Sequence, residues 1–271
     1  MKSLIDFLGN HKKIMAISYI YKVKIKKIIK AFLPPIVITV LRGLSSKNRL
    51  RSNLSDKEFY KPLFQPWLGY GNFSRILDRV SNYSLVSSDR VWVLHSLGTQ
   101  AMHLEGEFWE CGVYKGGTAL MLAEIVATTK DKKLRLFDTF EGMPTTDPDL
   151  DYHLKGDFSD NSLNAVRDMI GNQGNISFHS GFMPETFSGL EGNKIAFAHV
   201  DVDIYQSVMD CCEFIYPRLS PGGILVFDDY GFPSCPGARA AVDKFFEQQR
   251  EVPLVLPTGQ AVVIKLPSMI S

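Results

Sequence analysis

Five short apolar runs, separated by stretches with helical spacing, follow one another after about residue 85. They are the run within GEFWECG and the segments 134–140 (LRLFDTF), 176–181 (ISFHSG), 195–203 (IAFAHVDVD) and 222–231 (GGILVFDDYG). Strands that alternate with helices form an open, parallel α/β sheet with right-handed crossovers. Such a sheet gathers ligands beyond the carboxyl ends of its strands. The last stretch, VPLVLPTGQAVVIK, predicts a hairpin over a Thr-Gly turn.

Composition and charge divide the chain into two parts. At 271 residues and 45% apolar content, the chain is long enough for one large core with a small appendage. Residues 1–51 hold twelve of the 30 Lys and Arg residues but one of the 29 acids. We therefore expect a basic helical N-terminal extension and linker over residues 1–56, followed by one domain over residues 57–271.

The basic extension has two interpretations that the sequence leaves open. Residues 1–44 mix lysines through short apolar stretches, and Pro34 and Pro35 interrupt the longest of them, so we expect neither a membrane span nor a cleavable signal. The YKVKIKKIIKAF stretch suits a helix lying on an anionic membrane surface. It also suits a solvated helix that packs on the domain or on a second copy. The remainder is acidic and carries no nucleic-acid motif, so we expect no nucleic-acid partner.

The cysteines bear on the compartment. Cys111, Cys211, Cys212 and Cys235 show no C-x-x-C spacing, and two of them are adjacent. This pattern argues against a zinc site and against a disulfide framework. We therefore expect the reducing cytoplasm, with peripheral association at the inner face of the membrane if the basic extension binds lipid.

A glycine-rich turn follows the first apolar run. Residues 110–117 read E-x-G-x-x-x-G-G, which differs from the G-x-G-x-x-G of dinucleotide-binding proteins but also lets a backbone approach a ligand closely. Asp138 ends the next run, 21 residues after Gly117, where an acid that binds ribose hydroxyls is expected. By itself, the glycine-rich turn is as typical of a tight strand-to-helix connection as of a ligand-binding loop. The turn and Asp138 together favour a nucleoside-containing cofactor.

Two pairs of aspartates end the fourth and fifth runs: Asp201 with Asp203, and Asp228 with Asp229. Neighbouring parallel strands end about 5 Å apart, so the two pairs can share one ion. Without a cation, carboxylates this close repel one another and raise one another's pKa. A set of oxygen ligands favours Mg²⁺ or a similar hard ion. The alternative is a structural one, in which the acids serve turns and Asp203 caps the helix that follows.

Six motifs in this order resemble the macrocin O-methyltransferase (TylF-type) family: EFWECGVYKGG, LFDTFEGMP, GDFSD, GFMPETF, AHVDVDIYQS and LVFDDYG. The resemblance covers roughly residues 85–265. It implies a Rossmann-like class I methyltransferase with a mostly parallel seven-stranded sheet and an antiparallel last strand. It also implies S-adenosylmethionine- and metal-dependent methylation of a sugar hydroxyl.

The resemblance also implies roles for the acids. Asp201, Asp228 and Asp229 match the family's metal ligands, and Asp203 matches its general base, which makes Asp203 and Asp201 the predicted catalytic pair. The predicted cofactor-binding residues are Glu110, Gly112, Gly116, Gly117, Asp138 and Ser180. In this assignment the residues of the glycine turn hold the methionine part of the cofactor, Asp138 holds the ribose, and Ser180 lies near the adenine.

Two other functions stay open. Asp201-Val202-Asp203 is also the D-x-D pattern of metal-dependent glycosyltransferases, and a non-catalytic scaffold at a membrane surface can retain the same fold. For a methyltransferase, the expected acceptor is a small-molecule or lipid-linked sugar. Basic residues 1–44 favour a cell-surface polysaccharide or glycolipid. The sequence does not decide whether the protein forms a homo-oligomer.

The long acidic segment 141–162 predicts a lid or a substrate clamp. For its Asp147, Asp149, Asp151 and His153 we favour a solvated face over contact with a ligand. His199 lies inside an apolar run and is predicted to be a core histidine with its hydrogen bonds satisfied.

Overall fold

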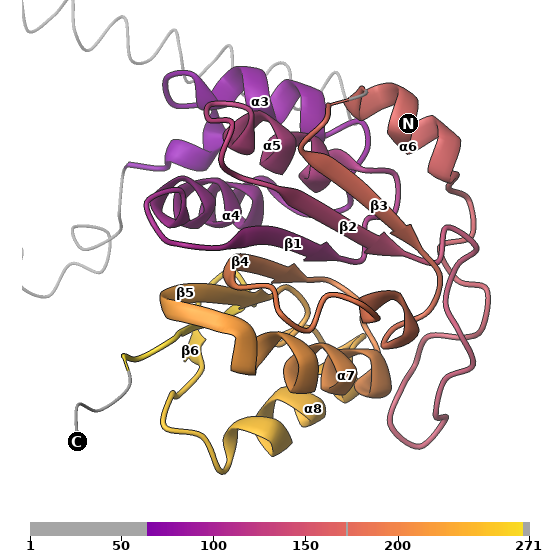
Figure 1. Cartoon of the computed structure of the whole chain (residues 1–271). Helices are drawn as coiled ribbons and strands as arrows, with labels where there is room; N and C mark the ends of the chain where they lie inside the picture. Colours follow the sequence, from indigo (N-terminus) through magenta and orange to yellow (C-terminus); the bar gives the residue numbers. More distant parts are fainter. Residues whose placement is uncertain (1–63, 172, 268–271) are drawn as a thin grey trace, which may run out of the picture. The chain divides into compact units, whose positions relative to one another are not determined.

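The fold is a seven-stranded α/β sheet, seen here in a computed structural model that describes residues 64–171 and 173–267 (Figure 1). The strand order is β3-β2-β1-β4-β5-β7-β6. β7 pairs antiparallel with β5 and with β6, whereas the other neighbours pair in parallel. The prediction of an antiparallel last strand is confirmed. The predicted extension and its boundary at residue 56 lie outside the described residues.

The strands are β1 (Glu107–Cys111), β2 (Leu134–Asp138), β3 (Ile176–Ser180), β4 (Ile195–Val200), β5 (Leu219–Phe227), β6 (Leu254–Val255) and β7 (Ala261–Ile264). The α-helices are α3 (Phe73–Val80), α4 (Ser88–Ala101), α5 (Gly117–Val126), α6 (Leu163–Ile170), α7 (Tyr205–Ile215) and α8 (Pro236–Phe246). Three 3-10 turns are η1 (Pro66–Leu68), η2 (Glu185–Phe187) and η3 (Tyr216–Arg218).

Helices cover both faces of the sheet, with α3, α4 and α5 on one face and α7 and α8 on the other (Figure 1). Each layer has its own apolar core, because successive side chains of a strand point to opposite faces. In β5, Ile224 and Val226 join the core beneath α4 and α5, whereas Leu225 and Phe227 join the core beneath α7 and α8.

The topology places a ligand crevice between β1 and β4. From β1 the chain moves outward to β2 and β3, then crosses back to β4 on the other side of β1. The strand order therefore reverses at this point, and open α/β sheets bind ligands beyond the carboxyl ends of the strands at such a reversal. The predicted glycine turn follows β1, and the predicted aspartates follow β4 and β5.

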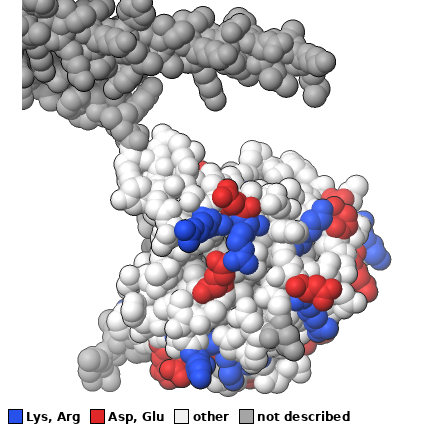
Figure 2. Space-filling model, turned by 90° about the horizontal axis from the view of Figure 1, so that it is seen from above, with Lys and Arg blue, Asp and Glu red and all other residues white. Residues whose placement is uncertain are grey.

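One face of the described domain carries mixed charge. Figure 2 views the domain from above the face that bears α3 and α5, and there small neighbouring groups of basic and acidic side chains are separated by wide uncharged areas. This mixture contrasts with the lysine-rich sequence of residues 1–51. Across residues 64–171 and 173–267, no helix combines the length and the apolar character needed to cross a bilayer.

Candidate active site

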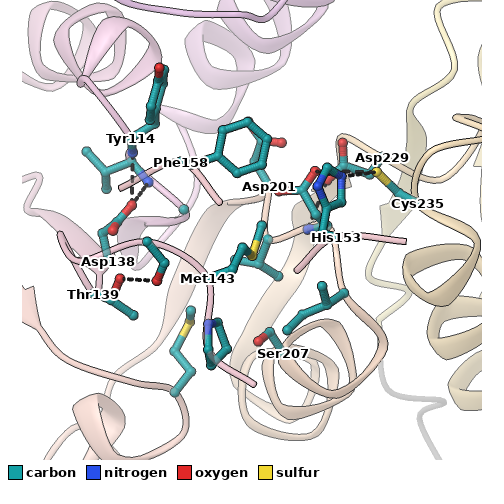
Figure 3. A pocket seen from close by; sticks show the side chains of 18 of the residues that line it. Tyr114, Asp138, Thr139, Met143, His153, Phe158, Asp201, Ser207, Asp229 and Cys235 are labelled. Carbon is teal, nitrogen blue, oxygen red and sulfur yellow. Dashed lines mark hydrogen bonds and ion pairs between the residues drawn. The ribbon is translucent and has the colours of Figure 1, made fainter. Parts of the chain in front are cut away.

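A cleft of about 490 Å³ opens at the carboxyl ends of β1, β2, β4 and β5. This volume lies within the range of about 300–1,000 Å³ that is usual for small-molecule sites. Tyr114, Asp138 and Thr139 lie at one end of the cleft, and Asp201, Asp229 and Cys235 lie at the other (Figure 3). The first end holds the glycine turn, and the second holds the aspartates.

Gly112 allows the turn after β1 to lie against the end of β4. Its φ of +88° is in the left-handed region, and a Cβ at this position would stand 1.8 Å from the carbonyl oxygen of Asp201. No side chain fits there, so glycine is required. Gly112 itself lines the cleft, as the sequence predicts for a cofactor-binding residue.

Gly116 and Gly117 start helix α5 and support the turn from behind. Gly116 is the N-cap residue, with a φ of +86°, and a Cβ on Gly117 would stand 2.6 Å from Cβ of Ser84. Gly112 is in the cleft lining, but these two glycines are not. Their cofactor-binding roles stay predictions, and the geometry gives them a role in positioning the turn.

Asp138 lines the cleft and holds the glycine turn in place. Its Oδ2 accepts the backbone N–H groups of Val113 at 2.7 Å and Tyr114 at 2.9 Å, and its Oδ1 accepts that of Phe140 at 2.7 Å. A carboxylate has about four acceptor positions, so one remains for a ligand hydroxyl. The predicted contact with ribose is compatible with this arrangement.

Glu110 and Ser180 lie away from the lining of the cleft. Glu110 is fully buried on the α4 side of the sheet, where its Oε1 is 3.0 Å from Nδ1 of His199, and its Oε2 has no hydrogen-bond partner. Ser180 is exposed at the end of β3 and donates a hydrogen bond to the Thr139 carbonyl at 3.4 Å. Their contacts with cofactor stay predictions.

Asp201, Asp203 and Asp229 face the other end of the cleft with few hydrogen-bond donors. Burial and the neighbouring carboxylates raise the pKa of Asp201 and of Asp229 well above the usual value. Burial also raises the pKa of Asp203, although His153 opposes that effect. A cation would remove the mutual repulsion, and carboxylates such as those of Asp201 and Asp229 are oxygen ligands that Mg²⁺ prefers. The site therefore fits a magnesium ion.

Asp228 is fully buried and does not line the cleft, but one of its carboxylate oxygens lies within 4.8 Å of potential ligand atoms of Asp201 and His199. It forms an ion pair with Arg90, and its Oδ1 accepts a hydrogen bond from Nε2 of Gln260 at 2.7 Å. Burial raises its pKa, but His199, Arg90 and Gln260 outweigh that effect and lower it. A carboxylate has about four acceptor positions, so these contacts leave room for the predicted ion. The role of Asp228 as a metal ligand stays a prediction.

His199 is a core histidine, as the sequence predicts, but its Nε2 has no hydrogen-bond partner, so the prediction that its hydrogen bonds are satisfied is wrong for that nitrogen. Both of its nitrogens face acids, with Nδ1 near Glu110 and Nε2 3.4 Å from Oδ1 of Asp228. Burial lowers the pKa of His199, but the neighbouring carboxylates of Asp228 and Glu110 outweigh that effect and raise it to about 10. This buried ion pair ties the ends of β1, β4 and β5 together below the cleft.

Asp151 caps helix α7, a role that the sequence did not reveal. Its Oδ1 accepts the backbone N–H of Tyr205, the first residue of α7, at 2.8 Å. Gly237 makes room for this contact, since a Cβ there would stand 1.9 Å from the same oxygen. The interpretation of Asp203 as the cap is therefore wrong: the N-cap residue is Ile204, and Asp203 has a φ of +59°.

His153 brings segment 141–162 to the acidic end of the cleft (Figure 3). Its Nε2 lies 3.6 Å from Oδ1 of Asp203, and its Nδ1 lies 3.3 Å from Oδ2 of Asp157. The predicted solvated face is therefore wrong for His153 and Asp151, which turn inward. It is confirmed for Asp147 and Asp149, which are exposed. Nothing in the spacing of these residues signals which of them turn inward.

Other lining residues were also missed, because loop positions carry no periodicity that marks them. Among them are Tyr83, Tyr114, Met143, Phe158, Phe182 and Phe232. They give the middle of the cleft an apolar and aromatic surface, which suits a small organic ligand.

The sequence profile of the macrocin-O-methyltransferase (TylF) family matches residues 80–256, which include both ends of the cleft. The chain belongs to this family. The match agrees closely with the predicted extent of the resemblance.

Two curated relatives are similar to this chain. One is the 8-demethyl-8-(2,3-dimethoxy-alpha-L-rhamnosyl)-tetracenomycin-C 4'-O-methyltransferase of Streptomyces olivaceus, 30% identical over 146 residues, which are 49% of this chain and 56% of that protein. The other is the mycinamicin III 3''-O-methyltransferase of Micromonospora griseorubida, 28% identical over 155 residues, which are 52% of this chain and 60% of that protein. The matched segment thus spans little more than half of each relative.

Solved structures show the same fold. The O-methyltransferase NovP superposes with a TM-score of 0.61 at 21% identity, over 68% of this chain and 83% of that one. The calicheamicin methyltransferase CalS11 superposes with a TM-score of 0.59 at 18% identity, over 70% of this chain and 90% of that one. These matches confirm the predicted Rossmann-like class I methyltransferase fold.

Proposed function

We propose that this protein is an S-adenosylmethionine- and Mg²⁺-dependent O-methyltransferase that methylates a sugar hydroxyl. The observation that carries the proposal is a single cleft whose two ends differ in chemistry. A glycine turn braced by Asp138 lies at one end, and the poorly paired Asp201, Asp203 and Asp229 lie at the other. Family membership and the names of the relatives support the same conclusion.

Each end has its own task. When bound, S-adenosylmethionine would supply a methyl group attached to a sulfonium sulfur, and Mg²⁺ would supply positive charge that acidifies a hydroxyl. Gly112 would contact the methionine part of the cofactor and Asp138 its ribose, and Asp201 and Asp229 would hold the ion. Asp203 faces the cleft and accepts the proton that the acceptor hydroxyl loses. Segment 141–162, fixed by Asp151, excludes water from the reacting groups.

A sugar acceptor follows from the relatives together with the site. One curated relative is named for methylation of a rhamnosyl-tetracenomycin, and the other for methylation at position 3'' of mycinamicin III. A cation held by carboxylates on one side of an apolar cleft can orient two neighbouring hydroxyls of a sugar ring. We extend the proposal to a glycoside, either a natural product or a cell-surface polysaccharide intermediate.

The alternative functions have less support. A glycosyltransferase that uses Asp201-Val202-Asp203 as its D-x-D motif is not favoured, because family and fold both point to methyl transfer. A non-catalytic scaffold would show no methyl transfer at all, so the assay below separates it from an enzyme.

The experiment measures methyl transfer from radiolabelled S-adenosylmethionine to a panel of glycosides, with Mg²⁺ and with a chelator. We expect transfer that requires the cation. Asp203→Ala should lower turnover by roughly 100-fold or more while S-adenosylhomocysteine binds with nearly wild-type affinity in calorimetry. Asp149→Ala, at an exposed position of segment 141–162, is the matched control and should behave like wild type. Loss of cofactor affinity in Asp203→Ala contradicts the assigned role.

We also propose that the protein is cytoplasmic and associates with the inner face of the membrane through residues 1–44. The support is the charge of this segment in the sequence, where lysines are interleaved with apolar residues. Deletion of residues 1–44 should abolish flotation with anionic liposomes and leave methylation of soluble acceptors intact. Flotation that survives the deletion contradicts this proposal.

A further inference from the structure

Three side chains that commonly bind transition metals meet at the acidic end of the cleft. His153 comes from segment 141–162, Asp203 follows β4, and Cys235 precedes α8. One potential ligand atom from each lies within 4.8 Å of the other two. Cys235 is almost fully buried, and the side chains of His153 and Asp203 are 19% and 17% exposed.

The distances match three corners of a zinc tetrahedron. Sγ of Cys235 lies 3.7 Å from Nε2 of His153 and 3.3 Å from Oδ1 of Asp203, and that Nε2 and Oδ1 lie 3.6 Å apart. With bonds of about 2.3 Å to sulfur and about 2.0–2.1 Å to nitrogen and oxygen, the edges of such a tetrahedron are about 3.3–3.6 Å. The three atoms need to move only a few tenths of an ångström to surround an ion.

Asp157 provides a second, independent observation. Its Oδ2 lies 3.3 Å from Nδ1 of His153, on the far side of the ring from Cys235 and Asp203. This carboxylate favours the proton on Nδ1 and leaves Nε2 as the lone-pair nitrogen that faces the other two ligands. Histidines that bind metal usually have such a carboxylate or carbonyl behind them, because it fixes the ring and its tautomer.

We propose that His153, Asp203 and Cys235 form a binding site for Zn²⁺ or another thiolate-binding transition-metal ion. The site is distinct from the predicted Mg²⁺ site, because a sulfur ligand disfavours Mg²⁺ and the Mg²⁺ ligands Asp201 and Asp229 are all-oxygen. Three protein ligands leave a fourth position for water or a ligand in the cleft. The spacing of the cysteines could not reveal this site, since its ligands come from three distant segments.

The ion would link segment 141–162 to the body of the domain and occupy the carboxylate of Asp203. Because Asp203 is the proposed general base, Zn²⁺ should inhibit methyl transfer even when Mg²⁺ is saturating. This consequence rests on the proposed function, whereas binding of the ion does not.

The test titrates the full chain with Co²⁺ in saturating Mg²⁺, without acceptor or cofactor, and follows the near-ultraviolet absorption of thiolate bound to cobalt. We expect one Co²⁺ per chain with this absorption. Cys235→Ser should abolish the absorption, and His153→Gln should weaken Co²⁺ binding by roughly tenfold or more. Two variants serve as controls: His103→Gln, at an exposed position, and Cys212→Ser, at another buried cysteine. Each should keep the thiolate absorption and the wild-type affinity for Co²⁺.

Two results overturn the site: no thiolate absorption in the wild-type protein, or absorption that persists in Cys235→Ser. Circular dichroism of each variant shows whether it is folded. If Cys235→Ser does not fold, the loss of Co²⁺ binding in His153→Gln decides whether the site exists. In a second arm, Zn²⁺ should inhibit wild-type methyl transfer and inhibit Cys235→Ser at least roughly tenfold less, each relative to its own activity without Zn²⁺. If no methyl transfer occurs in any condition, the proposed function fails while the cobalt titration still decides the metal site.

Discussion

The two ends of the cleft both present carboxylates, the partly buried Asp138 at one end and the buried Asp229 at the other, but they satisfy them in opposite ways. Asp138 accepts three backbone N–H groups, all from the turns that it braces. Asp229 accepts one backbone N–H, that of Asp203 at 3.2 Å, and otherwise lies among other acids, so that burial and their charge raise its pKa. The carboxylate at the first end has its hydrogen-bond donors within the protein, whereas the carboxylates at the second end lack a positive charge to balance them.

This difference separates carboxylates that stabilise the folded site from carboxylates that are placed to bind a cation. A carboxylate that accepts several backbone N–H groups stabilises the folded chain, and its removal costs stability. Buried carboxylates without a cation destabilise the folded chain, and the removal of one relieves repulsion. The same substitution, Asp to Asn, should therefore have opposite effects on stability at the two ends.

The largest effect is expected for Asp229→Asn. Loss of a proposed cation ligand should lower methyl transfer roughly 1,000-fold, or about 4 kcal/mol of transition-state stabilisation. In chelator, the melting temperature of the variant should equal or exceed that of wild type, because one buried repelling charge is gone. The methyl-transfer assay checks the first statement, and thermal unfolding with Mg²⁺ and with chelator checks the second. A variant that melts well below wild type in chelator would show that Asp229 is a structural acid like Asp138.

Gly112→Ala should cost about 3 kcal/mol of stability, because the added methyl group would collide with the backbone of Asp201 and the residue has a positive φ. The collision lies between the two ends, so binding of S-adenosylhomocysteine and the thermal shift caused by Mg²⁺ should both weaken. Urea denaturation and calorimetry measure these effects. Gly189→Ala, also at positive φ but with open space around it, is the matched control and should cost less.

Asp138→Asn should lower the free energy of unfolding by about 2 kcal/mol. The amide replaces one acceptor oxygen by an N–H₂ group, which cannot accept the backbone N–H groups that this oxygen binds. Affinity for S-adenosylhomocysteine should fall with it, and Mg²⁺ should still produce a thermal shift. If the variant is as stable as wild type, Asp138 does not stabilise the fold, and the proposed contrast with Asp229 is wrong.

Asp151→Ala is expected to cost about 1 kcal/mol, the usual value of a helix cap, because Tyr205 loses its acceptor at the start of α7. Amide hydrogen exchange should increase in segment 141–162 and in the first turn of α7. Asp149→Ala provides the comparison on the same segment, and equal exchange in both variants would argue against the capping role.

The sequence predicted those parts of the molecule that depend on local pattern. Alternation of apolar runs and helical stretches predicted the parallel strands, and acids at strand ends predicted where Asp138, Asp201 and Asp229 gather. Pattern could not predict which way Asp228 turns, because its orientation depends on Arg90, which is 138 positions away in the chain. It also could not predict that Asp151 and His153 turn inward, since both act through contacts made by a loop with no repeating pattern.

The central claim is that one cleft holds a cofactor at the Asp138 end and a divalent cation at the Asp201–Asp229 end. Its most direct test is a crystal structure with Mn²⁺ and S-adenosylhomocysteine, with the ion located by anomalous scattering. The account predicts a peak about 2.1 Å from side-chain oxygens of Asp201 and Asp229, with the nucleoside beside Asp138. A peak elsewhere, or none while methylation persists in chelator, would contradict it.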